Sequence, residues 1–232
     1  MQENNIEMEY VSFRNIAYKS VFSKSGFTLA EVLLALTIIG VVASYTIPSL
    51  FQNVTDSALL IKYKQAFSDL SAATRTLETN KITIDTSSED DFRAEYKSVM
   101  NVVKEDAVEN LQDTALNCYK SDSICSNTPG YPAFLLSNGV TITFISRGSN
   151  CSGSWGSLTK VCGDFMIDVN GKSPPNMVGK DYFEAWLIKK NGGYLVVPSG
   201  SNNDGFSCVA GSADWWTSSG CSAIPFKNGS MP

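Results

Sequence analysis

The pattern of hydrophobic and polar positions divides the chain into an N-terminal part with one long apolar run and a C-terminal part with shorter apolar segments. The longest apolar run extends from Phe27 to Ile47, and its 21 residues include one charge, Glu31. A helix of 21 residues is about 31 Å long, which matches a bilayer hydrocarbon core of about 30 Å. We therefore predict a membrane-spanning helix over residues 27–47.

Two simpler interpretations of this run leave Glu31 unexplained. The run fits a plain signal anchor, and it also fits a secretory signal cleaved after Ala43. Neither explains why the helix keeps a carboxylate, which costs up to about 3 kcal/mol at the centre of a membrane helix. The bases that precede the run are Arg14, Lys19 and Lys24, and they predict a cytoplasmic N-terminus and an exported C-terminal part.

Downstream of this run, apolar positions recur at alternating spacings of three and four residues, which is the period of a helix face. The positions are Leu60, Tyr63, Phe67, Leu70, Thr74 and Leu77. Lys62 and Asp69 fall on other sides of this helix. Pro48 removes one backbone donor and is expected to kink the helix without ending it. The pattern predicts one helix from about 28 to 79, with an amphipathic continuation over residues 48–80.

A second amphipathic helix is predicted within residues 87–105. Ser88 is a suitable N-cap residue, and the three residues after it are acidic, which favours the N-terminal end of a helix. The apolar stripe of this helix consists of Phe92, Tyr96, Val99 and Val103. This helix is expected to cover the core.

After Cys125 the hydrophobic period changes to two residues, which is typical of strands. The segments 131–136 and 139–146 are joined across an Asn-Gly pair and predict a hairpin. Further strands are expected over residues 163–169, 181–189 and 192–198. Helices followed by antiparallel strands predict an α+β domain over residues 81–232, packed on the long helix.

All six cysteines lie beyond the apolar run. They are Cys118, Cys125, Cys151, Cys162, Cys208 and Cys221. An even number predicts disulfides and an oxidising compartment, and neighbour pairing is the simplest connectivity, with others left open. A zinc site is disfavoured because the chain has no CxxC motif and no histidine.

Composition and charge exclude several function classes. A net charge of −5 argues against a nucleic-acid-binding surface, which is normally basic. Without histidine, the usual serine and cysteine triads and histidine-metal sites are excluded. Asp164 and Asp168 form the one carboxylate pair considered for glycoside chemistry, although strand carboxylates are more often solvated. We therefore expect no enzymatic activity.

The segment after Gly200 is rich in Ser, Gly and Asn and is expected to depend on a disulfide for its structure. Cys208 and Cys221 bracket two adjacent aromatic residues, Trp215 and Trp216. Exposed tryptophans stack on sugars, but packing in the core or tail is the favoured interpretation, because a tryptophan buries a large area.

Four oxygen-bearing side chains in the loop after residue 167 are weak candidates for a Ca²⁺ site. They are Asp168, Asn170, Asn176 and Asp181. A calcium loop normally has more acids and a terminal glutamate. An Asn-Gly turn followed by the rigid Pro174-Pro175 pair explains the same residues. No cofactor is therefore expected.

The residues "KSG" and "FTLAEVLLALTIIGVV", 24–42, resemble the class III signal of type IV prepilins, shared by type IV pilins and the pseudopilins of type II secretion. The resemblance is close over residues 24–50. It implies that a membrane peptidase removes residues 1–26, a cytoplasmic leader, and that Phe27 is then N-methylated after cleavage at Gly26. Glu31 becomes the fifth residue of the mature chain, where the family carries its glutamate, and Pro48 falls where many pilins have a helix-bending proline.

The resemblance further implies a pilin-like fold and a structural function, polymerisation into a type IV pilus or a type II secretion pseudopilus. The implied partners are prepilin peptidase/N-methyltransferase, identical or related subunits, an inner-membrane assembly platform, and membrane lipid before assembly. The implied location is the bacterial inner membrane with a periplasmic C-terminal domain, and then a periplasmic or cell-surface filament. The new α-amine at Phe27 is basic and can pair with Glu31 of another subunit.

The alternative is a minor tip pilin that acts as an adhesive or binding module through Trp215 and Trp216.

Overall fold

The computed structural model describes residues 26–84, 87–112, 115–121, 123–127, 131–201 and 204–229. The predicted leader up to residue 25, with its three bases, lies outside the described residues. Contacts within the chain define two units, one that ends at Ile47 and one that begins at Pro48.

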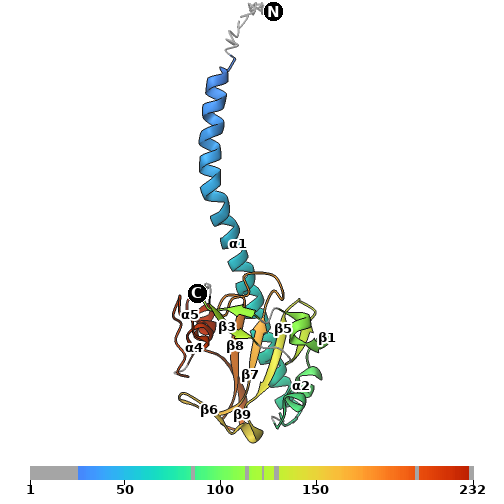
Figure 1. Cartoon of the computed structure of the whole chain (residues 1–232). Coiled ribbons are helices and arrows are strands. Elements are labelled where there is room, and N and C mark those ends of the chain that lie inside the picture. The colour runs from blue at the N-terminus through green and yellow to red at the C-terminus, as the bar shows by residue number, and fades with distance from the viewer. Residues whose placement is uncertain are drawn as a thin grey trace, which may run out of the picture. The chain divides into compact units, whose positions relative to one another are not determined.

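The first element is the helix α1, which extends from Leu29 to Thr79 and contains Pro48 (Figure 1). The prediction of one helix from about 28 to 79 is confirmed. By length and composition, α1 is long and apolar enough to cross a membrane. Leucine, isoleucine and alanine dominate its first part, and these residues have good or moderate helix propensity.

The second unit is built on an antiparallel seven-stranded sheet with the order β1-β4-β5-β7-β8-β9, in which β6 also pairs with β7. Its strands are β1 (Val102–Ala107), β4 (Pro132–Leu136), β5 (Thr141–Ser146), β6 (Gly153–Trp155), β7 (Leu158–Asp168), β8 (Tyr182–Lys190) and β9 (Gly193–Pro198). A separate two-stranded sheet consists of β2 (Ala115–Asn117) and β3 (Ile124–Asn127). The remaining helices are α2 (Glu89–Lys97), α3 (Val108–Leu111), η1 (Ser149–Cys151), α4 (Trp215–Ser219), η2 (Gly220–Ala223) and α5 (Ile224–Lys227).

The large sheet is covered on both faces. The C-terminal part of α1 crosses behind the strands in Figure 1, and with α2 it forms the main hydrophobic core against inward-facing residues such as Phe165 and Phe183. The opposite face packs against the small sheet and the C-terminal segment, where Met166 contacts a cluster that includes Leu116 and Trp215. An α+β arrangement of a long helix on an antiparallel sheet is therefore present.

The predicted helix face of α1 is the face that packs on the sheet. Tyr63, Leu70 and Leu77 are fully buried, while Leu60 and Phe67 are partly buried. Thr74 is buried as well, and its hydroxyl lies 2.8 Å from the hydroxyl of Tyr96 on α2. Each fully buried large apolar side chain contributes about 1.5–3 kcal/mol, so this stripe is a main source of stability for the second unit.

The second predicted helix is shorter than expected. α2 begins after Ser88, whose hydroxyl accepts a hydrogen bond from the Asp91 amide as predicted, but it ends at Lys97. Phe92 and Tyr96 are buried, whereas Val103 is 64% exposed on the edge strand β1 and does not extend the helical stripe. The expectation for Val103 was wrong because a β-branched residue fits a strand at least as well as a helix.

The predicted hairpin turn is present, and a second Asn-Gly pair forms another turn. β4 and β5 pair antiparallel across a turn in which Gly139 has a φ of +81°, a conformation that glycine adopts without strain. β8 and β9 are joined through Asn191 and Gly192, which both have positive φ, as a two-residue hairpin turn requires. The Asn-Gly pairs therefore set the register of the two hairpins.

Candidate functional site

The peptide between Gly26 and Phe27 lies just before α1. Neither Gly26 nor Phe27 is in a helix, and Phe27 is 85% exposed. A Cβ atom built on Gly26 would meet no atom within 4 Å. The bond predicted to be cleaved is therefore in non-helical, accessible backbone.

Glu31 forms a capping box with Thr28 at the start of α1. One carboxylate oxygen of Glu31 accepts hydrogen bonds from the Thr28 amide and the Thr28 hydroxyl, each at 2.8 Å. The Thr28 hydroxyl accepts in turn from the Glu31 amide at 3.3 Å. This reciprocal pattern satisfies backbone donors at the helix N-terminus. The T-x-x-E spacing that signals it is present in the sequence, but sequence analysis considered only the charge of Glu31.

The apolar side chains that follow the capping box are exposed along the first unit. Among them, Leu29 is 80% exposed and Ile39 is 63% exposed. An apolar surface of this length has no stabilising contact in water, so it requires lipid or other apolar helices around it.

A further exposed apolar set on α1, within the second unit, was not predicted. It consists of Leu50, Phe51, Val54 and Ile61, with exposed fractions of 62%, 71%, 67% and 65%. Their spacing of three, four and seven residues places most of them on one side of a helix, and this spacing could have been read from the sequence. The α1 helix thus has apolar residues available for contact beyond the membrane-length run.

The six cysteines form three disulfides in the described part of the chain, each between neighbours in sequence. The pairs are Cys118–Cys125, Cys151–Cys162 and Cys208–Cys221. The predicted neighbour pairing is therefore present. The third disulfide ties the Ser/Gly/Asn-rich segment to η2, which contacts β8.

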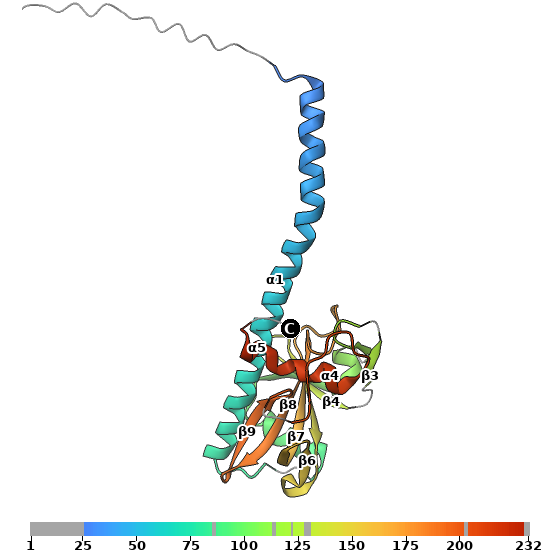
Figure 2. The same ribbon diagram turned by 90° about the vertical axis from the view of Figure 1, so that its left-hand side faces the viewer.

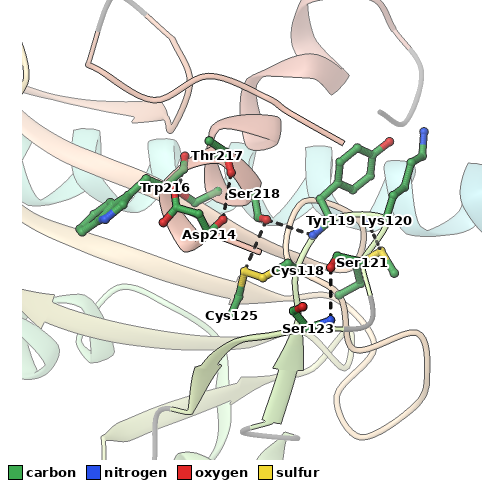
Figure 3. Close-up of a disulfide and its surroundings, with 12 residues drawn as sticks. Cys118, Tyr119, Lys120, Ser121, Ser123, Cys125, Asp214, Trp216, Thr217 and Ser218 are labelled. Atoms are coloured by element: carbon green, nitrogen blue, oxygen red, sulfur yellow. Dashed lines mark hydrogen bonds between the residues drawn. A yellow bond between two sulfur atoms is a disulfide. The ribbon is translucent and has the colours of Figure 1, made fainter. Parts of the chain in front are cut away.

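The Cys118–Cys125 disulfide closes the loop between β2 and β3 and lies against the C-terminal segment (Figure 3). The hydroxyl of Ser218 accepts a hydrogen bond from the Tyr119 amide at 3.0 Å and lies 3.5 Å from Cys125 Sγ. The Gly211 amide donates to the Tyr119 carbonyl at 2.9 Å. The segments that carry these two disulfides are therefore hydrogen-bonded to each other on the sheet face opposite α1.

The two adjacent tryptophans have different environments. Trp215 is partly buried and packs edge-on against Tyr182. Trp216 is 44% exposed, and its ring contacts those of Trp155 and Phe206 at centroid distances of 5.7 and 5.2 Å. Trp215 thus belongs to the domain core, and Trp216 is the outer member of an aromatic cluster.

The carboxylate pair considered for glycoside chemistry is buried, and each acid has structural partners. The Arg147 guanidinium binds Asp164 through two contacts of 2.5 and 3.0 Å. Asp168, at 2% exposure, accepts hydrogen bonds from the Asn170 and Gly171 amides. Burial raises the pKa of Asp164 to about 6, and the Arg147 charge opposes that rise.

Glu184 on β8 is a buried acid next to Asp164 that sequence analysis did not identify. It is 1% exposed; its amide donates a hydrogen bond to the Ser222 hydroxyl in the C-terminal segment, and its carbonyl accepts one from the Ser199 amide directly after β9. Burial raises the pKa of Glu184 to about 8, and the Asp164 charge adds to the rise. No local signal identifies such a residue, because its neighbours come from distant strands.

The candidate calcium residues mainly hold the loop between β7 and β8. The Asp181 carboxylate accepts hydrogen bonds from the Asn176 and Met177 amides at 2.8 and 2.6 Å. The Asn170 side chain donates to a carbonyl within the same loop. Among the described residues there is no group of three or more His, Cys, Asp or Glu side chains that could hold a metal ion. The expectation that this loop binds no cofactor, with these residues as weak Ca²⁺ candidates, stays a prediction.

A comparison with protein-family models matches residues 22–46 to the prokaryotic N-terminal methylation motif. The chain therefore carries the class III signal of type IV pilins and pseudopilins, and the matched residues include Gly26, Phe27 and Glu31. Searches of curated proteins and of solved structures return no match.

Proposed function

We propose that the chain is a prepilin that is cleaved after Gly26, N-methylated on Phe27 and polymerised into a type IV pilus or a type II secretion pseudopilus. The observation that carries the proposal is the methylation motif at the start of an apolar, exposed helix. Lipid covers this helix before assembly, and helices of identical or related subunits cover it in the filament. Its function is polymerisation rather than catalysis.

Processing requires an accessible peptide bond, which the non-helical backbone at Gly26 and Phe27 provides. Prepilin peptidase/N-methyltransferase cuts on the cytoplasmic side of the inner membrane and methylates the new N-terminus. The C-terminal domain lies in the periplasm, an oxidising compartment in which its three disulfides are stable. An inner-membrane assembly platform then takes up the mature subunit.

Glu31 has two roles in this proposal, one before assembly and one after it. In the precursor its carboxylate caps α1 through Thr28. After cleavage, the cationic amine of an incoming subunit pairs with the Glu31 carboxylate of a subunit already in the filament. Because two opposite charges attract strongly where water is excluded, this pair fixes the axial register of neighbouring helices.

Three substitutions separate capping from charge. Glu31→Gln keeps an amide oxygen that can cap α1 but removes the charge, so cleavage is expected to continue while incorporation into filaments is lost. Thr28→Ala keeps the charge and removes the capping hydroxyl, which costs about 0.5–2 kcal/mol of helix stability, so filaments still form. Glu31→Ala removes both. The measurement is the amount of mature chain in sheared filaments. Filament formation by Glu31→Gln at the wild-type level would contradict the proposed charge pair.

A second candidate function is that of a minor tip pilin that acts as an adhesive or binding module. The observation that favours it is the exposed ring of Trp216, supported by Trp155, over which the Arg147 guanidinium lies at 4.9 Å. A minor pilin would be scarce in purified filaments and dispensable for their bulk. Trp216→Ala would then leave filament number unchanged and reduce adhesion, whereas a major subunit would be the most abundant filament protein.

A further inference from the structure

The two edges of the large sheet carry opposite charge. At one edge, β1 and the adjacent helix α2 form an acidic flank. Its six carboxylates belong to Glu89, Asp90, Asp91, Glu95, Glu105 and Asp106. Its three cations belong to Arg93, Lys97 and Lys104. Each of these cations pairs with a carboxylate of the flank, and because six carboxylates face three cations, the flank keeps an excess of negative charge.

The acidic flank also presents one exposed apolar side chain. Val103 is 64% exposed at an irregularity of β1, and the next residues of the strand are Lys104, Glu105 and Asp106. An exposed apolar residue on an acidic edge strand can contact an apolar depression that has cations beside it.

The opposite edge of the sheet has such a depression. A groove of about 340 Å³ lies beside the β8–β9 hairpin, and we call it the basic groove. Its apolar lining includes Leu158, Ile188 and Leu195, and its cations are Lys189 and Lys190. Leu195 is 44% exposed on the edge strand β9. Figure 2 shows β9 on the side of the domain next to α1.

The two lysines of the basic groove form no ion pair within the described part of the chain. Lys189 lies 5.6 Å from the centroid of the Tyr194 ring. The nearby carboxylate of Glu78 accepts a hydrogen bond from the Tyr194 amide. Lys190 lies beside the apolar lining, whereas Lys189 pairs with Tyr194 on the opposite face of the sheet. Both lysines are at the end of the β8–β9 hairpin, and in a chain with a net charge of −5 they favour an acidic protein partner.

We propose that the basic groove of one subunit receives the acidic flank of a second copy of this chain, with Val103 against Leu195 and with carboxylates facing Lys189 and Lys190. The proposal rests on the proposed polymerisation. Complementary patches on opposite edges of one molecule make a heterologous contact, which generates an open filament where the rotation between subunits does not close a ring. A contact between two like edges would place charges of the same sign together, which is unfavourable.

Charge reversal at each edge tests this contact in cells that assemble the whole chain. Lys189→Glu with Lys190→Glu makes the groove acidic, and Asp90→Lys with Glu95→Lys gives the flank an excess of cations. Each pair of substitutions is expected to lower the amount of chain in sheared filaments at least about tenfold, because like charges then meet at the contact. All four substitutions in one chain restore opposite charge and are expected to recover filaments to within about threefold of wild type.

A matched control reverses two exposed lysines outside both edges, Lys120→Glu with Lys172→Glu, and is expected to leave the filament yield within about twofold of wild type. Melting temperatures of the purified variants verify that each domain folds. A photo-crosslinking residue at position 195 gives an independent measurement, and the crosslinked peptide is expected within residues 87–107 of another subunit.

The outcomes separate this contact from the proposed function. If wild type enters filaments and both edge variants do so equally well, the contact is wrong and polymerisation stands. A crosslink from position 195 to any region outside residues 87–107 also overturns the contact. If the wild-type chain is never found in filaments, the proposed function fails and the contact fails with it.

Discussion

Replacing Glu184 with glutamine is expected to remove a pH dependence of folding stability. Glu184 is 1% exposed, and the neighbouring Asp164 is fully buried. Within the described part of the chain, Arg147 is the cation that pairs with this acid cluster. Arg147 binds Asp164 and forms no ion pair with Glu184 among the described residues, so burial and the Asp164 charge raise the pKa of Glu184 to about 8 and favour its neutral form.

The sign and size of the effect follow from the pKa in the two states. A glutamate in an unfolded chain has a pKa of about 4.3. Between that value and the folded pKa of about 8, the folded state keeps a proton that the unfolded state has lost. The free energy of unfolding therefore falls as the pH rises through this range. At about 1.4 kcal/mol for each pKa unit, the loss from Glu184 is at most about 5 kcal/mol and is complete above a pH of about 8.

The assay is urea unfolding of the whole chain in detergent at pH 5, 7 and 9, followed by tryptophan fluorescence. Glu184→Gln is expected to match wild type within about 1 kcal/mol at pH 5 and to exceed it by several kcal/mol at pH 9. Glu109→Gln, at an exposed glutamate of α3, is the control and should follow wild type at each pH. An equal loss of stability with pH in wild type and Glu184→Gln would refute the reasoning.

Three further predictions concern the hydrophobic core, the disulfide of the C-terminal segment, and the loop between β7 and β8. Leu70→Ala removes a fully buried side chain of α1 and is expected to lower the free energy of unfolding by about 2–5 kcal/mol in urea titrations; a loss below about 1 kcal/mol would contradict its place in the core. Replacing Cys208 and Cys221 with serine opens a loop with a sequence separation of 13. The free energy of unfolding is expected to fall by about 3 kcal/mol, measured by thermal unfolding of the variant and the wild type. Ca²⁺ is expected to leave the melting temperature unchanged relative to EDTA, because Asp168 and Asp181 already accept backbone hydrogen bonds; a rise with Ca²⁺ would show that the loop binds it.

Local sequence patterns were sufficient to predict the elements whose structure depends on residues close together in the sequence. The three- and four-residue spacing identified the buried face of α1, including Tyr63 and Leu77, because a helix brings such positions together. The Asn-Gly pairs identified the hairpin turns, because few other residues accept positive φ. Val103 was assigned to a helix because its spacing continued the α2 stripe, whereas it lies at an irregularity of β1, between Val102 and Lys104, which both pair with β4.

Features that depend on distant residues were not predictable in this way. Glu184 lies in an apolar strand, and only the register between β7 and β8 brings it near Asp164. The charge difference between the two sheet edges likewise depends on strand order, which places β1 and β9 at opposite ends. The capping box of Thr28 and Glu31 is different, because its spacing is local and was present in the sequence.

The most direct test of the central claim is the mass and N-terminal sequence of the mature chain, isolated from the membrane and filament fractions of a strain with an active prepilin peptidase. The proposed function predicts a chain that begins at Phe27, carries one N-methyl group and occurs in both fractions. A chain that retains Met1, or that begins at Ser44 after cleavage at a secretory signal, would contradict it.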